Sequence, residues 1–266
     1  MNAEWHTWIE TNISRGCSPH EMYLILQEHG ILHHEIIGAF LNKRVDMRLV
    51  NRRGNTHPFH DIAITKNPVV QRHNDARIQL FYIENFLHPA ECRWFISKME
   101  QQFEPSTVTT GEDSKDFRTS QTGHLRLESI EDLVPAQVER RIAVTLGIPL
   151  HYSEPTQVQK YSSGQEFKPH TDAFAPNSDE FSTYAADYGQ RTWTCMIYLN
   201  DTPKGGHTRF TKLDVGFTPR IGLALFWNNL REDGNPNSWT IHHGMPVIEG
   251  EKYIITKWFR ENSNIT

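Results

Sequence analysis

The first forty residues place apolar and polar side chains with the period of a helix. Four apolar residues recur three or four positions apart and share one helical face: Trp5, Trp8, Ile9 and Ile13. Residues 18–21 read Ser-Pro-His-Glu, a capping box with proline at the first helical position, and they precede an apolar run at 22–28. Gly30 ends that run, and residues 33–41 repeat the periodicity. The pattern therefore predicts a small helical unit over residues 1–44.

The next segment, residues 45–76, has a different character. It is polar and basic, contains two prolines and lacks sustained periodicity. We therefore interpret it as a linker or wrapping segment.

From residue 77 onward the pattern is mostly that of strands. Residues 77–86 mix β-branched and aromatic side chains, and residues 88–101 and 138–146 follow as amphipathic helices. Short strand-like stretches separated by turn residues then continue to the end: 156–161, 166–170, 192–199, 207–211, 222–227, 239–243 and 252–259. Many short strands of this kind indicate a sandwich or barrel. We predict a mainly β domain over residues 77–266, with a double-stranded β-helix (jelly-roll) core and supporting helices.

Composition narrows the function classes. The 266 residues include 27 basic and 32 acidic side chains, so there is no general case for a nucleic-acid binder. Three cysteines that lie far apart do not suggest a disulfide framework. The longest apolar runs are far shorter than a bilayer span, and the first residues do not resemble a signal peptide. We therefore predict a cytoplasmic protein that binds neither nucleic acid nor membrane.

Three features after residue 160 suggest a metal site. His170 and Asp172 follow a predicted strand and, being two residues apart, point to the same side of an extended chain. His242 comes about seventy residues later. Two histidines and one carboxylate leave three positions open on a metal, as in non-haem iron(II) oxygenases. Lys252 lies ten residues beyond His242, where its charge could pair with a carboxylate of a bound co-substrate.

Each of these residues also has an ordinary interpretation. A lone His-x-Asp is more often a surface pair or a capped turn. Lys252 alone is typical of a solvated charge on a strand. His243 competes with His242, although neighbouring strand residues point to opposite faces, so only one of them can face a metal. Zinc also binds histidine and aspartate, and the spacing alone leaves a zinc hydrolase open.

Several sequence blocks in a fixed order narrow these alternatives. They are Phe-Arg-Thr-Ser at 117–120, a helix and its Gly-Ile-Pro exit at 141–149, the strand at 161–172, the stretch 191–201, Gly-Gly-His-Thr-Arg-Phe at 205–210, and 242–258. Through these blocks the chain resembles, from about residue 78 to 261, the prolyl 4-hydroxylase family of iron(II)- and 2-oxoglutarate-dependent dioxygenases.

The resemblance implies a role for several residues near the metal. His170, Asp172 and His242 would bind iron(II), and Lys252 would bind the distal carboxylate of 2-oxoglutarate. Four further residues would surround the co-substrate: Tyr198, by a hydrogen bond to the same carboxylate, Tyr161, Thr208 and Trp258. Tyr161 and Trp258 are also consistent with plain packing residues of a core.

The resemblance implies substrate residues as well. Arg191 and Arg118 lie where relatives approach the substrate, although surface salt bridges would explain them equally well. Trp193 stands where the family often has Ala or Val, and it would reshape the substrate pocket if it faced the barrel interior. His207 and Met245 also depart from the usual pattern.

The family's chemistry uses 2-oxoglutarate and dioxygen as co-substrates and releases succinate and carbon dioxide, with ascorbate as the expected reductant. We therefore predict hydroxylation of a prolyl residue in a protein or peptide. The alternative is a hydroxylase of a free amino acid, a cyclic imino acid or a small peptide natural product. Residues 105–125 and 173–190 are expected to decide between them. The helical unit at 1–44 is a second candidate interaction site, for a protein partner, or else a brace on the barrel.

Overall fold

The computed structural model describes residues 1–17, 19–31, 33–43, 45, 59–100, 102–106, 117–124, 133–176, 178–185 and 187–263. The chain divides into two compact units, which are described one at a time. The first holds Met1–His60 with Glu232–Gly234, and the second holds Asp61–Arg231 with Asn235–Thr266.

The described part of the first unit contains three helices: α1 (Ala3–Ser14), α2 (Pro19–Glu28) and α3 (His33–Asn42). Asn2 caps α1 by accepting a hydrogen bond from the backbone nitrogen of Trp5 at 3.0 Å. Gly30 follows α2 with a φ of 77°, a conformation that glycine adopts without strain. The helices enclose a small core: Ile9, Met22, Leu26, Ile36, Ala39 and Phe40. Ser18, the first residue of the predicted capping box, lies outside the described residues.

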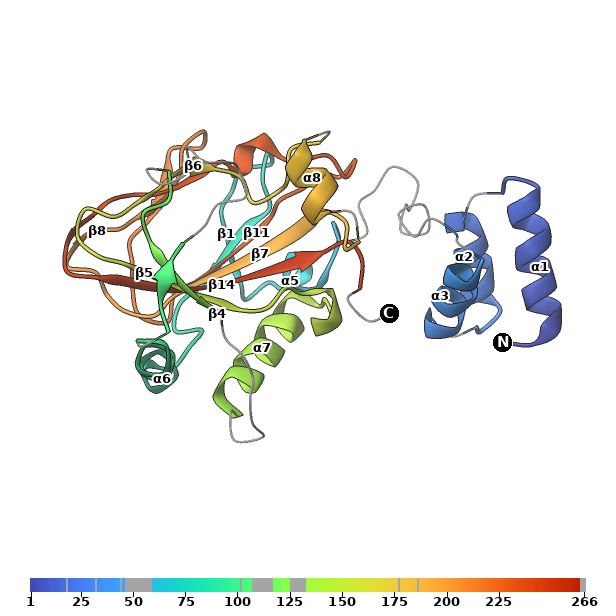
Figure 1. Cartoon of the computed structure of the whole chain (residues 1–266), viewed down its shortest axis with the longest axis horizontal. Helices are drawn as coiled ribbons and strands as arrows, with labels where there is room; N and C mark the ends of the chain where they lie inside the picture. The colour runs from blue at the N-terminus through green and yellow to red at the C-terminus, as the bar shows by residue number, and fades with distance from the viewer. Residues whose placement is uncertain are drawn as a thin grey trace. The chain divides into compact units, whose positions relative to one another are not determined.

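The second unit is built on an eight-stranded antiparallel sheet, the major sheet (Figure 1). Its strand order is β1 (Gln71–Arg72), β2 (Leu80–Ile83), β11 (Ala224–Asn228), β7 (Arg191–Tyr198), β14 (Lys252–Arg260), β5 (Gln157–Tyr161), β4 (Gln121–His124) and β3 (Glu104–Pro105). The central strands β7, β11 and β14 are almost wholly buried, and their sequences are accordingly rich in apolar residues on both faces, although β7 and β14 also carry buried polar side chains.

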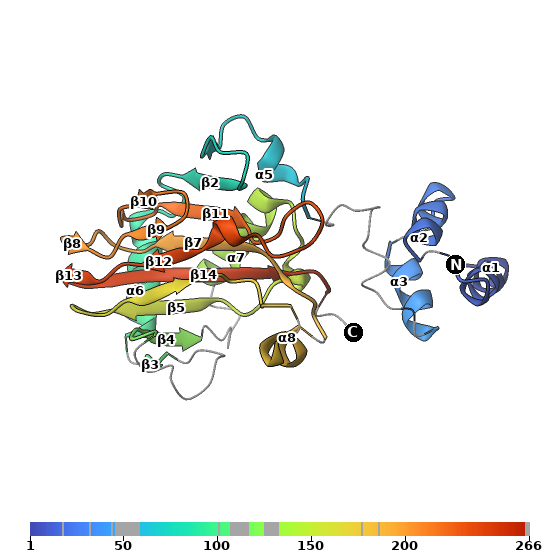
Figure 2. The same cartoon turned by 90° about the horizontal axis from the view of Figure 1, so that it is seen from above.

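A four-stranded minor sheet faces the major sheet (Figure 2). Its order is β10 (Val215–Phe217), β9 (Thr208–Phe210), β12 (His242–Gly244) and β6 (Phe167–His170), and β13 (Val247–Glu249) pairs separately with β8 (Lys204–Gly205). Side chains from both sheets, including Tyr198, Ile254 and Phe210, form one buried core between them. This mainly β architecture with facing antiparallel sheets is the jelly roll that the sequence predicts.

Two helices, α6 (Pro89–Met99) and α7 (Leu133–Leu146), cover the outer face of the major sheet (Figure 1). α6 begins at the predicted residues, where His88 and Glu91 form a reciprocal capping box. The two helices are joined by an ion pair between Arg141 and Glu91, 2.7 Å long. A second ion pair, 2.6 Å long, connects Lys257 of β14 to Glu139 of α7. The helices therefore brace the sheet on the side away from the minor sheet.

The remaining elements are short. They are α5 (Ala63–Lys66), the 3-10 turns η2 (Leu150–Tyr152) and η3 (Ser238–Thr240), and α8 (Asp179–Tyr184). The stretch predicted as a strand at 239–243 is η3 followed by β12, because the Asn237 side chain accepts from the backbone nitrogen of Trp239 at 3.0 Å and caps a turn there. α8 was not predicted because its six residues are too few for a helical period to be recognised.

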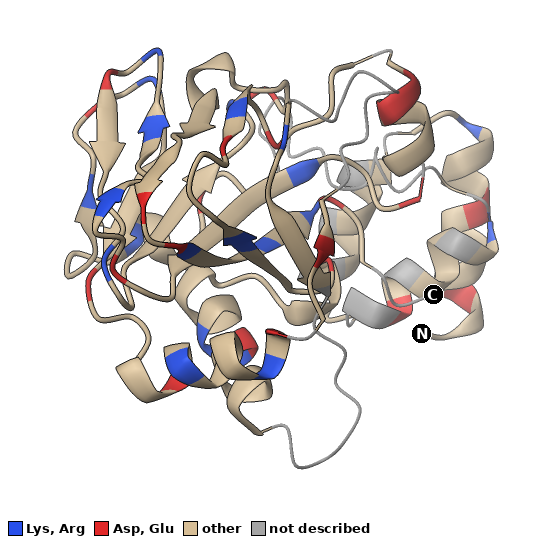
Figure 3. Cartoon of the chain, turned by 60° about the vertical axis from the view of Figure 1, so that its left-hand side comes forward, with Lys and Arg blue, Asp and Glu red and all other residues tan. Residues whose placement is uncertain are grey.

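Among the described residues, no helix combines the length and apolarity that crossing a membrane requires. Basic and acidic positions are interspersed along the strands and helices in the view of Figure 3.

Candidate active site

The structure brings the three predicted metal ligands together at one edge of the minor sheet. His170 ends β6, Asp172 follows two residues later, and His242 begins β12. Because β6 and β12 are antiparallel with His242 opposite His170, their rings lie 4.2 Å apart between centroids. One possible ligand atom from each of the three residues lies within 4.8 Å of the other two.

The backbone orients both histidines in the same way. Nδ1 of His170 lies 2.8 Å from the carbonyl oxygen of Lys168, and Nδ1 of His242 lies 2.9 Å from that of Thr240. A carbonyl only accepts, so each Nδ1 carries the proton and each Nε2 keeps its lone pair for a metal. Burial and the neighbouring His242 lower the pKa of His170 well below its ordinary value, which favours the neutral, metal-binding imidazole.

Asp172 is 7% exposed and uses its two oxygens differently. Oδ2 accepts a hydrogen bond from Thr194 Oγ1 at 2.7 Å, whereas Oδ1 lies 4.0 Å from Nε2 of His170. Two imidazoles and one carboxylate oxygen thus converge, and this donor set fits ferrous iron. Zinc accepts the same donors, so the geometry alone leaves the metal open.

His243 lies on the opposite face of β12 from His242. Its Nε2 is 2.7 Å from a carboxylate oxygen of Glu166, so its ring is directed into a hydrogen bond with Glu166 and away from the three ligands.

Lys252 is buried at the start of β14, with 1% of its surface exposed. Its Nζ donates to the carbonyl of Gly206 at 3.1 Å and lies 4.1 Å from the ring centroid of Tyr161. Burial lowers the pKa of Lys252 to about 7, and no carboxylate in the described part of the chain pairs with it. A buried ammonium without a counterion fits the distal carboxylate of 2-oxoglutarate.

A narrow cavity is lined by Lys252 and the three ligands together with Tyr161, Thr208 and Trp258; contact of these last three residues with a co-substrate stays a prediction. The indole nitrogen of Trp258 is buried and has no hydrogen-bond partner in the described residues. Tyr198 does not line this cavity. Its hydroxyl donates to Thr208 Oγ1 at 2.7 Å, so it reaches the cavity through Thr208, and its direct bond to a carboxylate stays a prediction.

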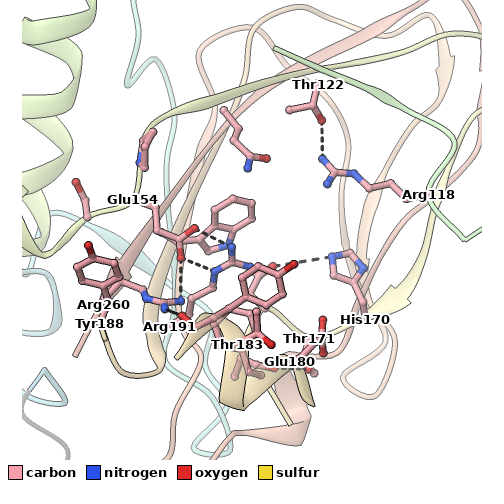
Figure 4. A pocket seen from close by; sticks show the side chains of 18 of the residues that line it. Arg118, Thr122, Glu154, His170, Thr171, Glu180, Thr183, Tyr188, Arg191 and Arg260 are labelled. Atoms are coloured by element: carbon pink, nitrogen blue, oxygen red, sulfur yellow. Dashed lines mark hydrogen bonds and ion pairs between the residues drawn. The ribbon is translucent and has the colours of Figure 1, made fainter. Parts of the chain in front are cut away.

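A second, wider cavity of about 1050 Å³ opens on the other side of His170 and Asp172. Residues 105–125 and 173–190, the segments expected to decide the substrate, both contribute to its lining; residues 107–116 lie outside the described part. Figure 4 shows Arg118 and His170 on one side of the cavity and Glu154, Arg191 and Arg260 on the other.

Both predicted substrate arginines line the wide cavity. Arg191 binds Glu154 with two hydrogen bonds of 2.6 and 2.8 Å, and its guanidinium lies 3.9 Å from the ring centroid of Trp258. Arg118 donates to Thr122 Oγ1 at 3.0 Å and lies 4.9 Å from the ring centroid of Phe167. These arginines are therefore cavity walls stacked on aromatic rings, although their contact with a substrate stays a prediction.

The prediction for Trp193 needs correction. Its side chain is fully buried against Phe81 on the outer face of the major sheet, and it lines neither cavity. The inner face of β7 carries Thr194 and Tyr198 instead. Strict alternation from Arg191 would have placed Trp193 inward, but the pairing of β7 with β14 shifts register beside Arg191. The structure therefore removes Trp193 from the candidate substrate residues.

Sequence reasoning also missed three polar residues of the site. They are Glu154, Arg260 and Thr194. Arg260 donates to the carboxylate of Glu154 at 3.1 Å, and Thr194 donates to that of Asp172. The alternation of β14 could have indicated Arg260, because it is two residues from Trp258 and shares its face. Nothing in the local sequence around Glu154 signals its role.

Comparison with known proteins defines the class first. Residues 156–260, a span that contains the three ligands and Lys252, match the family model described as the 2OG-Fe(II) oxygenase superfamily. The structure resembles the viral collagen prolyl hydroxylase of Paramecium Bursaria Chlorella virus-1 in its 2OG complex. The TM-score is 0.55 at 24% identity, covering 68% of this chain and 95% of that one. This likeness shows the jelly-roll fold.

Curated relatives then define the family. The chain is 34% identical to probable prolyl 4-hydroxylase 3 of Arabidopsis thaliana over 67% of its own length and 68% of the relative's. It is 31% identical to a putative prolyl 4-hydroxylase of Acanthamoeba polyphaga mimivirus, over 68% and 74% of the two chains. The chain therefore belongs to the prolyl 4-hydroxylase family of iron(II)- and 2-oxoglutarate-dependent dioxygenases, as its sequence predicts. Membership favours iron over zinc at the three ligands.

Proposed function

We propose that this chain hydroxylates a prolyl residue in a protein or peptide, using iron(II), 2-oxoglutarate and dioxygen. One observation supports the proposal: His170 and Asp172 line both cavities, so a metal held by them would lie between a narrow pocket that Lys252 also lines and a wide, open one. Bound iron would supply the oxidising chemistry that couples conversion of 2-oxoglutarate to succinate with oxidation of the substrate.

The chain's own residues divide the remaining work. His170, Asp172 and His242 would hold the metal, Lys252 would bind the distal carboxylate of 2-oxoglutarate, and Arg191 and Arg118 would contact the substrate. The rings of Tyr161, Phe167 and Trp258 border the site and would limit the access of water to it.

The size of the wide cavity supports a peptide substrate. Its volume of about 1050 Å³ is at the upper end of sites that enclose whole small molecules, and a free amino acid would leave most of it unfilled. The curated relatives are named prolyl 4-hydroxylases, which favours proline as the residue oxidised.

Mass spectrometry after aerobic incubation with iron(II), 2-oxoglutarate and ascorbate tests the proposal. The panel contains proline-bearing peptides, free amino acids and cyclic imino acids, with His242→Ala as the inactive control. One oxygen on a peptidyl proline, matched by succinate, is the expected result. Oxygen added to a free amino acid would show that the substrate is a small molecule and not a peptide. Absence of succinate from iron-loaded protein would overturn the assignment of a dioxygenase activity.

Three further proposals accompany this one. We propose ascorbate as the reductant that keeps the iron ferrous, so omitting it should shorten the active phase of the reaction.

The three free cysteines, Cys17, Cys92 and Cys195, support a reducing, cytoplasmic location, which fractionation would test. Residues 1–44 would bind a protein partner as a unit, with residues 45–76 as a linker or wrapping segment and a dioxygenase domain at 77–266. A folded fragment of residues 1–76 would favour this division.

A further inference from the structure

Behind Asp172, two buried polar residues form a directed chain of hydrogen bonds. Thr194 of β7 and Asn229, which follows β11, are both fully buried. Thr194 Oγ1 donates to Asp172 Oδ2 at 2.7 Å, and Asn229 Nδ2 donates to Thr194 Oγ1 at 2.8 Å. An ionised carboxylate only accepts, so the single hydroxyl hydrogen of Thr194 must point to Asp172. The donor to Thr194 must therefore be the amide nitrogen of Asn229.

The backbone of the same residue leads to a second ligand. The carbonyl of Asn229 accepts from the backbone nitrogen of Asn237 at 2.8 Å. Asn237 in turn caps η3 through its side chain, and its carbonyl accepts from Thr240 Oγ1 at 2.7 Å. Thr240 supplies the carbonyl that fixes Nδ1 of His242. Asn229, Asn237 and Thr240 thus connect the surroundings of two of the three ligands.

We infer that Thr194, Asn229 and Asn237 are positioning residues that orient Asp172 and His242 for the metal without touching it. This inference rests on the proposed metal site. With Oδ2 held by Thr194, Oδ1 of Asp172 would stay on the side of His170, where it could bind the metal, because rotation about the Cβ–Cγ bond is otherwise soft. Loss of a hydrogen-bond partner of a metal ligand typically lowers metal affinity about 10–100-fold, and we expect a loss of this size when one of these residues is replaced.

Calorimetric titration of the full-length, metal-free protein with Mn²⁺ tests the inference without relying on activity. Thr194→Val should weaken Mn²⁺ binding about 10–100-fold, and Thr194→Ser, which restores the hydroxyl, should bind nearly as tightly as the unaltered chain. Thr192→Val is the matched control. Thr192 is equally buried on the same strand, but its hydroxyl donates to the carbonyl of Phe259 at 3.1 Å and to no partner of a ligand.

A double variant separates the chain of hydrogen bonds from general destabilisation. If Asn229 acts through Thr194, then Asn229→Leu in the Thr194→Val background should weaken Mn²⁺ binding no further, whereas independent effects would multiply. Asn229→Leu also serves as the test if Thr194→Val does not fold. Thermal unfolding of each metal-free variant shows that folded proteins are compared.

The outcomes are distinct. Equal Mn²⁺ affinity in Thr194→Val and the unaltered chain, or equal losses in Thr194→Val and Thr192→Val, would overturn the positioning role and leave the metal site intact. If the unaltered chain bound no Mn²⁺ at His170, Asp172 and His242, the metal site itself would be wrong, and the positioning role with it.

Discussion

The two ends of the narrow cavity differ in the hydrogen-bond and charge partners that the protein supplies. At the metal end, each of the three ligands has a hydrogen-bond partner that fixes its orientation: Lys168 for His170, Thr194 for Asp172 and Thr240 for His242. At the other end, Lys252 is 1% exposed, and among the described residues the neighbours that favour its charge are the carbonyl of Gly206 and the ring of Tyr161. Among the described residues, the protein itself orients every ligand at the metal end, whereas the ammonium at the other end has no carboxylate partner.

This difference has an energetic meaning. Placing an ammonium in a site without a counterion disfavours its charged form, which is why burial lowers the pKa of Lys252 to about 7. A bound carboxylate would reverse that effect and make the charge favourable. Lys252 would thus stabilise a complex with an anionic ligand at the expense of the free protein, a trade that is common in binding sites.

Removing a ligand at the metal end should have the largest effect. Asp172→Asn or His242→Ala should abolish succinate formation, because each removes a donor that the other two residues cannot replace. His243→Ala is the matched control, since His243 pairs with Glu166 on the opposite face. Succinate measured with saturating 2-oxoglutarate checks this. Loss in His243→Ala with full activity in His242→Ala would show that the other histidine binds the metal.

Removing the charge at the other end should weaken binding rather than chemistry. Hydrogen bonds to charged groups contribute about 1.5–3 kcal/mol, so Lys252→Met should raise the KM for 2-oxoglutarate about 10–150-fold, with a smaller change in kcat. The same substitution should raise the thermal stability of the free protein, because a buried unpaired charge is replaced by an apolar chain of similar length. A variant that is less stable and binds 2-oxoglutarate normally would contradict the contrast between the two ends.

The pH dependence of 2-oxoglutarate binding should follow Lys252. In the free protein a pKa of about 7 means that Lys252 is mostly charged at pH 6 and mostly neutral at pH 8. Binding of the dianion favours the charged form, so above pH 7 a proton must be taken up. The dissociation constant should therefore rise about tenfold from pH 6 to pH 8. Titration calorimetry in buffers of different ionisation enthalpy measures the uptake, and Lys252→Met, which retains the three metal ligands, should show none from this position.

Substitutions in the wall of the wide cavity should impair the reaction less than substitutions at either end of the narrow cavity. Burial opposes ionisation of Glu154, but the guanidiniums of Arg191 and Arg260 outweigh it and keep the pKa of Glu154 low. Glu154→Gln should raise the KM for a peptide and lower the free energy of unfolding by about 1–3 kcal/mol, because two buried guanidiniums lose their shared carboxylate. The KM for 2-oxoglutarate should stay unchanged. An equal rise in both constants would mean that the pairing supports the whole barrel.

The parts of this site that sequence could predict are those with a local pattern. The ligands stand at strand ends with a two-residue spacing, and the block order is characteristic of the family, so His170, Asp172, His242 and Lys252 could be named in advance. Glu154 and Thr194 could not, because their partners lie far away in the chain. In the fold, long strands such as β7 and β14 were predictable from their apolar runs, whereas two-residue strands such as β1 and β3 depend on pairing partners.

Trp193 shows how one local irregularity changes an interpretation, and its substitution should have the smallest effect on catalysis. The family pattern suggested Trp193 as a substrate residue if it faced the barrel interior, as strict alternation with Arg191 would require, but the register shift beside Arg191 turns it to the outer face against Phe81. Trp193→Phe should therefore lower the free energy of unfolding by about 1–3 kcal/mol, through lost packing in the core, and leave the KM for a peptide and for 2-oxoglutarate unchanged. Denaturant unfolding alongside peptide kinetics measures both. A changed peptide KM with unchanged stability would place Trp193 in the cavity after all, because a packing residue on the outer face affects substrate only through the stability of the sheet.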